Sequence, residues 1–312
     1  MAVQSNDDDE LMMFEARRTC CASCGIAEID DMKLKGCDDC DLVKYCSDEC
    51  QKNHKSEHEE ECRKRAAELV RDELLFKQNE SSYLGDCPIC CVPLPLDQQK
   101  STMMECCSKV ICSGCTVANL LREMEMRLRP SCPFCRATTN EDFDKLRMKR
   151  VEANDPVAIR QEGMEQYKKG EYIRAYEYWV KAAELGHVET HFRLACMYQL
   201  GHGVEKDRGK EMYHFEEAAI GGHPDARYNL GLNEWCMQHN NVERAVKHFI
   251  IAATLGCDDS IKALKDMFKE GSVEKEDLAA AFRAHKAAVD ATKSPQREFA
   301  NKFWRKQAAK KV

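Results

Sequence analysis

Cysteines cluster in the first half of this chain, in pairs whose spacing suits metal binding. Seventeen of the 20 cysteines lie between Cys20 and Cys135, and only three follow. Two thiolates separated by two residues can reach one ion, and four such ligands complete the tetrahedral shell of a structural zinc ion. A thioredoxin-like redox role for these pairs is disfavoured, because they occur together with matching metal-ligand partners. The first half therefore predicts zinc sites.

The first cluster holds eight candidate ligands within residues 21–62, enough for two zinc ions. This segment has 42 residues, too few for a robust apolar core, so each zinc ion would contribute roughly 10–16 kcal/mol to its folding. A three-residue gap on a helix places two ligands on one face, and the last two pairs therefore fit two short helical pieces. The four pairs are Cys21 with Cys24, Cys37 with Cys40, Cys46 with Cys50, and His58 with Cys62.

The second cluster holds eight further candidates within residues 87–135, again enough for two zinc ions. Cys106 and Cys107 are adjacent, and neighbouring residues of an extended chain point in opposite directions. Both can bind one ion only if the chain turns at 106–107; otherwise one of them is a bystander. Apolar residues at helical spacing predict a helix between the last two pairs, ended by Pro130. The pairs are Cys87 with Cys90, Cys106 with Cys107, Cys112 with Cys115, and Cys132 with Cys135.

The first cluster resembles the MYND zinc finger. The resemblance rests on its eight ligands, on Tyr45 before Cys46, and on the run CQKNHKSEHEEEC that ends at Cys62. It implies a finger that binds short proline-containing peptides of partner proteins and performs no catalysis, with His54 left out of the metal shell. It also implies interleaved sites, with one zinc ion held by Cys21, Cys24, Cys46 and Cys50 and the other by Cys37, Cys40, His58 and Cys62.

The second cluster resembles a RING finger in the motifs CPIC at 87–90, CCSKVICSGC at 106–115 and CPFCR at 132–136. It departs from the usual pattern because all its ligands are cysteines, two of them adjacent, and because the expected helix lacks a tryptophan that many active ligases carry. The resemblance implies one site of Cys87, Cys90, Cys112 and Cys115 and another of Cys106, Cys107, Cys132 and Cys135.

RING fingers commonly act as ubiquitin ligases, which position a charged ubiquitin-conjugating enzyme and contribute no nucleophile. The resemblance implies that Ile89 and Pro133, inside the first and last knuckles, contact this enzyme. Arg136 follows the last ligand, at the place of the family's bridging cation, and its forked guanidinium suits two sets of backbone carbonyls. The alternatives are a solvated cation at Arg136 and a local packing residue at Ile89.

The second half repeats itself at a helical period. The segments AAELGH, AAIGGH and AATLGC begin at residues 182, 218 and 252, 36 and then 34 residues apart, a spacing typical of stacked helix pairs. Residues 182–231 resemble Sel1-like repeats, with the loop signature LGHGVEKDRGK at 200–210. We expect about four helix pairs over 155–290, whose concave face would bind partner proteins.

The predicted fold is therefore multidomain: two small zinc-stabilised cross-brace fingers followed by an all-α helix-pair solenoid, with four zinc ions in total. The tail carries seven basic residues and one acid, and we expect a solvated helix or a frayed end there. The expected parts are an acidic disordered N-terminus at 1–18, the MYND-type finger at 19–62, a linker helix at 63–82, the RING-type finger at 83–138, a linker at 139–154, the repeats at 155–290 and a basic tail at 291–312.

Composition narrows the function classes. Charged residues make up 32% of the chain and the net charge is −7, which disfavours a general nucleic-acid binder. No apolar run approaches the roughly 18 residues needed to span a membrane, and the acidic start lacks a secretory layout, so we expect a cytoplasmic or nuclear protein. The chain has neither the length nor the motifs of a MYND-linked methyltransferase.

Two hypotheses remain. The first is a RING-type ubiquitin ligase whose repeats and MYND-like finger choose the substrate. The second is a non-catalytic scaffold in which the zinc ions are purely structural. Both predict proteins as partners, and the sequence names neither a substrate nor a conjugating enzyme.

Overall fold

The computed structural model describes residues 20–29, 33–138, 142–236 and 241–309, and the chain forms two compact units, residues 1–75 and 76–312. We describe each unit by itself. The acidic segment predicted at 1–18 lies outside the described residues. None of the helices in the described ranges is long and apolar enough to cross a membrane.

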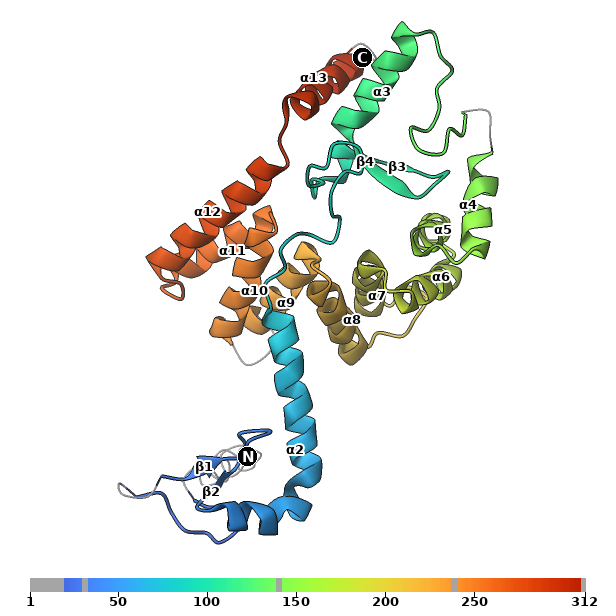
Figure 1. Ribbon diagram of the computed structural model, residues 1–312. Coiled ribbons are helices and arrows are strands. Elements are labelled where there is room, and N and C mark those ends of the chain that lie inside the picture. The colour runs from blue at the N-terminus through green and yellow to red at the C-terminus, as the bar shows by residue number, and fades with distance from the viewer. Residues whose placement is uncertain (1–19, 30–32, 139–141, 237–240, 310–312) are drawn as a thin grey trace, which may run out of the picture. The chain divides into compact units, whose positions relative to one another are not determined.

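The first unit is a small cysteine-rich finger joined to a long helix. Strands β1 (Lys35–Gly36) and β2 (Lys44–Tyr45) pair antiparallel, with Lys35 opposite Tyr45. Helix α2 (Asp48–Phe76) follows directly (Figure 1). The core beside the strands is made of the cysteines together with Leu34 and Val43.

Helix α2 corrects two sequence-based predictions. Two short helical pieces and a separate linker helix at 63–82 were expected, but one continuous helix of 29 residues carries Cys50, His58 and Cys62 and extends to Phe76. The physical reason is the absence of glycine and proline between Asp48 and Phe76, where lysine and glutamate, both good helix formers, dominate.

The second unit begins with the second finger. The 3-10 turn η1 (Gln98–Lys100) leads into strand β3 (Ser101–Met104), which pairs antiparallel with β4 (Lys109–Cys112). Helix α3 (Ser113–Glu125) starts where β4 ends. A small buried core of Leu94, Ile111 and three cysteines lies beneath the strands.

The linker predicted at 139–154 contains helix α4 (Phe143–Glu152), which packs against the first repeat helix. Arg147 on α4 donates from Nε to the Glu162 carboxylate at 3.0 Å, and both side chains are largely buried. This segment is therefore structured and continues the helical stack.

Eight helices form four consecutive pairs, in line with the four pairs that the period predicts. They are α5 (Pro156–Lys168), α6 (Tyr172–Glu184), α7 (Val188–Leu200), α8 (Arg208–Ile220), α9 (Pro224–Cys236), α10 (Val242–Thr254), α11 (Asp258–Lys269) and α12 (Lys275–Ala291).

The repeat period reappears in the core. Trp179, Phe215 and Phe249, each three residues before a repeated alanine pair, are all buried. Glycines on the partner helices make room for two of these rings: a Cβ on Gly163 would lie 2.5 Å from Trp179, and one on Gly231 would lie 2.6 Å from Phe249. The pairs α5 with α6 and α9 with α10 therefore each pack closely around one aromatic ring.

A connecting segment, residues 77–86, runs from α2 to the second finger and lies on the repeats at the turn between α8 and α9. Asn79 donates from Nδ2 to the Ile220 carbonyl at 3.0 Å, and its side-chain oxygen accepts from Arg227 at 3.3 Å. The Tyr83 amide donates to the Gly222 carbonyl at 3.2 Å, and the Tyr83 ring stacks on a histidine of the same turn. These contacts attach the second finger to the repeats.

The expected basic tail forms helix α13 (Pro295–Ala309), which packs against α3 of the second finger (Figure 1, red beside green). The Arg297 amide donates to the Ser294 hydroxyl at 3.3 Å, a side-chain cap that starts the helix. Gly114 on α3 allows close contact, since a Cβ there would lie 3.1 Å from the Arg297 nitrogen. Arg297 and Ala300 are buried, so this part of the tail is not a solvated or frayed end.

Candidate metal centres

The sixteen predicted ligands meet in four groups of four, and within each group all ligand atoms lie within 4.8 Å of one another. The grouping is the interleaved one that the two family resemblances imply. We number the groups site 1 (Cys21, Cys24, Cys46, Cys50), site 2 (Cys37, Cys40, His58, Cys62), site 3 (Cys87, Cys90, Cys112, Cys115) and site 4 (Cys106, Cys107, Cys132, Cys135).

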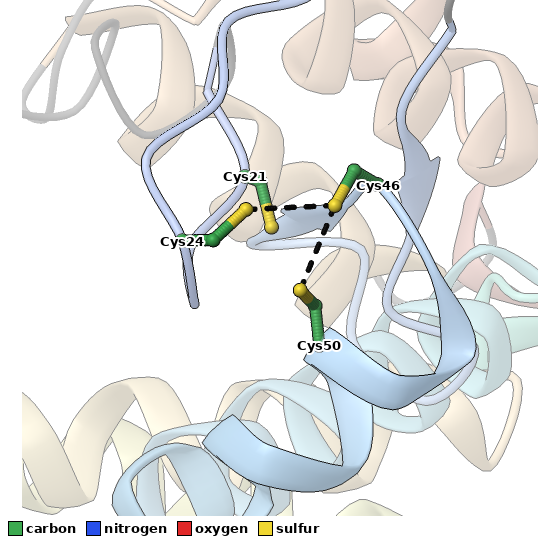
Figure 2. A group of neighbouring side chains, drawn as sticks. All are labelled: Cys21, Cys24, Cys46 and Cys50. Atoms are coloured by element: carbon green, nitrogen blue, oxygen red, sulfur yellow. Dashed lines mark hydrogen bonds between the residues drawn. The ribbon is translucent and has the colours of Figure 1, made fainter.

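Site 1 joins the loop after the first β-bridge to the start of α2. Figure 2 shows the four sulfurs converging, with Cys46 3.5 Å from Cys24 and 3.6 Å from Cys50. A tetrahedral zinc ion with Zn–S bonds of about 2.3 Å would separate its sulfurs by about 3.8 Å. The observed spacing therefore fits zinc after a small relaxation.

Site 2 combines three thiols with one imidazole. His58 Nε2 lies 3.1 Å from the Cys40 sulfur, and Cys37 and Cys62 lie 3.7 Å apart. Burial lowers the pKa of His58, which favours the neutral imidazole that binds metal. His54 lies outside this group of four, and its Nδ1 lies 3.1 Å from the Tyr45 hydroxyl.

Site 3 links the first knuckle of the second finger to the start of α3. The Cys87 and Cys115 sulfurs lie 3.8 Å apart, as do those of Cys90 and Cys112. The Cys112 amide also donates to the Cys87 sulfur at 3.4 Å. Cys112 is the N-cap position of α3, so the helix start itself places two of the four ligands.

Site 4 contains both of the adjacent cysteines, Cys106 and Cys107. The chain turns between β3 and β4: the Cys107 amide donates to the Met104 carbonyl at 3.1 Å, and Ser108 has a positive φ of 56°. This turn directs Cys106 and Cys107 toward one point, and the Cys107 sulfur lies 3.6 Å from that of Cys132. The turn that the sequence required is therefore present.

Four knuckles share one backbone device that sequence reasoning missed. The residue after the second cysteine has a positive φ, and its amide donates to the carbonyl of the first cysteine. Only one of the four is glycine, although this conformation favours glycine. The residues are Gly25 (φ 75°), Asp41 (52°), Cys91 (54°) and Arg136 (62°).

The thiols of one site differ in pKa, because each ionised sulfur disfavours ionisation of its neighbours. Burial disfavours the Cys21 thiolate, but hydrogen bonds from the Cys24 and Cys46 backbone amides outweigh it and lower the pKa of Cys21 to about 6. The neighbouring sulfurs of Cys24 and Cys50 raise the pKa of Cys46 to about 12. Four thiolates this close repel one another, so a dication is what allows all four to ionise.

Cys20 and Cys91, the spare cysteines beside complete pairs, stay outside the four groups. Cys91 is exposed and supplies the positive φ of its knuckle.

The three predicted contacts for a conjugating enzyme lie on two knuckles of the second finger. Ile89 is 45% exposed. Pro133 is partly buried, and Arg136 is exposed. Within the described residues, the Arg136 side chain forms no hydrogen bond or ion pair.

Comparisons with known proteins agree with two of the resemblances. The MYND finger model matches residues 21–62, and the Sel1 repeat model matches residues 161–187, 188–223 and 224–257. The chain carries a MYND finger and three Sel1 repeats. The fourth helix pair, α11 with α12, lies beyond the matched repeats. Both modules generally bind proteins, and the cysteine groups suit zinc, so these features support a zinc-binding protein-interaction adaptor.

Two solved structures are similar to this chain. One is c5321, described as a protective antigen of uropathogenic Escherichia coli strains with an SLR fold; it is 23% identical, with a TM-score of 0.42, over 47% of this chain and 33% of that chain. The other is a Sel1 repeat protein from Oxalobacter formigenes, 22% identical, with a TM-score of 0.43, over 54% of this chain and 50% of that chain. This chain thus spans between a third and a half of their lengths.

Proposed function

We propose that this adaptor is a RING-type ubiquitin ligase that holds four zinc ions through the sixteen side chains of sites 1 to 4. The second finger would bind a ubiquitin-conjugating enzyme, while the MYND finger and the repeats would bind the substrate. The observation that carries the proposal is the cross-brace of the second finger. The chain alternates between sites 3 and 4, as in the family it resembles.

The cross-brace would perform its function without a nucleophile. A RING-type ligase biases the thioester-linked ubiquitin toward attack through positioning and electrostatics. Ile89 lies inside the first knuckle and is 45% exposed, which suits an apolar contact to the conjugating enzyme. Pro133 lies inside the last knuckle, at the position that Pro88 holds in the first.

Arg136 suits the bridging role for two reasons. Its backbone has a positive φ and is held by the hydrogen bond from the Arg136 amide to the Cys132 carbonyl at 3.1 Å. Its guanidinium is exposed and uncommitted among the described residues, so it can fork between carbonyls of ubiquitin and of the conjugating enzyme.

The test is an autoubiquitination assay across a panel of conjugating enzymes. We expect Arg136→Ala to keep zinc and enzyme binding but to slow transfer by roughly tenfold or more, because a charge-assisted contact contributes about 1.5–3 kcal/mol. Ile89→Ala should instead weaken enzyme binding. Arg129→Ala, which removes an exposed arginine of the same finger away from the knuckles, is the matched control and should leave the rate unchanged.

The second candidate is a non-catalytic scaffold, and α3 is the observation that favours it. The helix offers no tryptophan, the residue that many active RING-type ligases carry there. A zinc-loaded wild-type protein that transfers no ubiquitin with any conjugating enzyme would contradict the ligase and favour the scaffold.

A further inference from the structure

A single arginine from the far end of the chain reaches into the second finger beside site 3. Arg297 lies in the first turn of α13 and is only 6% exposed. The side-chain cap from Ser294 and the close approach at Gly114 fix where this turn lies. Burying a charged side chain this deeply is costly unless the charge is compensated.

The positive charge of the guanidinium is compensated by groups in and just after the first knuckle. Its Nη1 donates to the Pro93 carbonyl at 2.6 Å, and its Nη2 donates to the Val92 carbonyl at 2.9 Å. Nη2 also lies 3.7 Å from the sulfur of Cys90, a ligand of site 3. One further hydrogen bond joins Nη1 to the Thr292 carbonyl at 2.7 Å, just before α13.

The contact places a positive charge beside a site that would be negatively charged when it holds zinc. A zinc ion with four thiolate ligands carries two net negative charges, and site 3 is largely buried. A cation that donates to one sulfur offsets part of this charge. Groups that hydrogen-bond to metal ligands orient them and tune how tightly the metal is held.

We propose that Arg297 is the outer-sphere cation of site 3, and that helix α13 thereby sets how tightly the second finger holds its first zinc ion. The inference rests on the proposed ligand set of site 3. It makes Arg297 a positioning residue, and it makes α13 an integral part of the second finger.

The test uses the full-length, zinc-loaded protein and measures zinc release to a chromogenic chelator. Thiol alkylation with mass spectrometry identifies which site opens first. Arg297→Gln should release one zinc equivalent about 10–100-fold faster, since loss of an outer-shell partner typically weakens metal binding by that factor. Cys91 and Cys236, which are exposed and lie outside the four groups, should react from the start, and Cys87, Cys90, Cys112 and Cys115 should be the first of the ligand cysteines alkylated.

Two variants separate charge from packing, and one serves as a control. Arg297→Lys keeps the charge and should release zinc more slowly than Arg297→Met, which keeps the bulk alone. Arg305→Gln removes an exposed arginine of the same helix and should match the wild type. Should Arg297→Met fail to fold, the comparison of Arg297→Lys with Arg297→Gln carries the same test.

Equal release from the lysine and uncharged variants, or wild-type release from Arg297→Gln, would overturn the role of the charge. A wild-type protein with no zinc at site 3 would contradict the ligand assignment instead. The two failures are therefore distinguishable.

Discussion

At the residue scale, the adjacent cysteines of site 4 give the sharpest test of the ligand set. Cys106→Ser and Cys107→Ser should each lose one of the four zinc ions, because each removes a thiolate from a closed tetrahedral site. Elemental analysis of the purified variants measures this. Cys91→Ser, which changes an exposed cysteine outside the four groups, should keep all four, and full zinc in either test variant would identify a bystander.

The knuckle conformation separates the backbone role of Arg136 from its side-chain role. Arg136→Gly should retain zinc, since glycine adopts the positive φ of 62° readily, yet lose ubiquitin transfer as Arg136→Ala does. Arg136→Val should also weaken zinc retention, because a β-branched residue is strained there. Zinc release and single-turnover transfer measure the two effects, and unimpaired transfer by the glycine variant would exclude the bridging role.

At the element scale, the repeat core predicts two glycine substitutions of different effect. Gly231→Ala should destabilise the repeats by roughly 1–3 kcal/mol, because its Cβ would overlap the Phe249 ring. Gly209→Ala should be neutral or stabilising by up to about 1 kcal/mol, since its Cβ meets only the Asp207 carboxylate at 3.4 Å and alanine favours a helix. Denaturant unfolding followed by circular dichroism compares the two, and equal stabilities would contradict the packing argument.

Removal of zinc with a chelator should affect some helices of the second unit and leave others unchanged. Removal of zinc should expose the backbone amides of α3 and α13 to hydrogen exchange, because α13 packs on the finger. Helices α5 to α10 should remain protected, since apolar packing holds them. Loss of protection throughout the repeats would show that they too depend on the metal.

The sequence predicts the elements whose signals are local and periodic. Cysteine spacing predicted the residues that meet in the four groups, and the 36- and 34-residue spacing predicted the helix pairs. It did not predict the continuous helix α2, because ligand spacing constrains one turn and says nothing of where a helix ends. Nor did it predict the contact of Arg297 with Cys90, which joins residues remote in sequence and depends on tertiary packing.

The positive-φ position after each knuckle was also missed, although it has a signal. It follows four of the five C-x2-C pairs by one residue, but three of these four positions hold aspartate, cysteine or arginine in place of glycine. The hydrogen bond within each knuckle holds the positive φ, together with the metal when it is bound, and residue type alone would not indicate this conformation.

At the scale of the whole molecule, the second finger and the repeats should separate when the connecting segment is weakened. Asn79→Ala removes the side-chain hydrogen bonds to the Ile220 carbonyl and to Arg227, and should cost about 0.5–1.5 kcal/mol for each bond lost. Limited proteolysis should then cut faster within residues 77–86. Glu80→Ala, at an exposed neighbouring position, is the control, and equal cleavage would show that the segment is held by other contacts.

The connecting segment also bears on how the repeats can choose a partner. Residues 77–86 are covalently tethered beside the turn between α8 and α9, and short tethers act as local concentrations in the millimolar range. A separate peptide that binds the same turn would compete with this covalently attached segment. A partner present at micromolar levels would therefore be outcompeted there, and the repeats must receive their partners on surfaces that this segment leaves open.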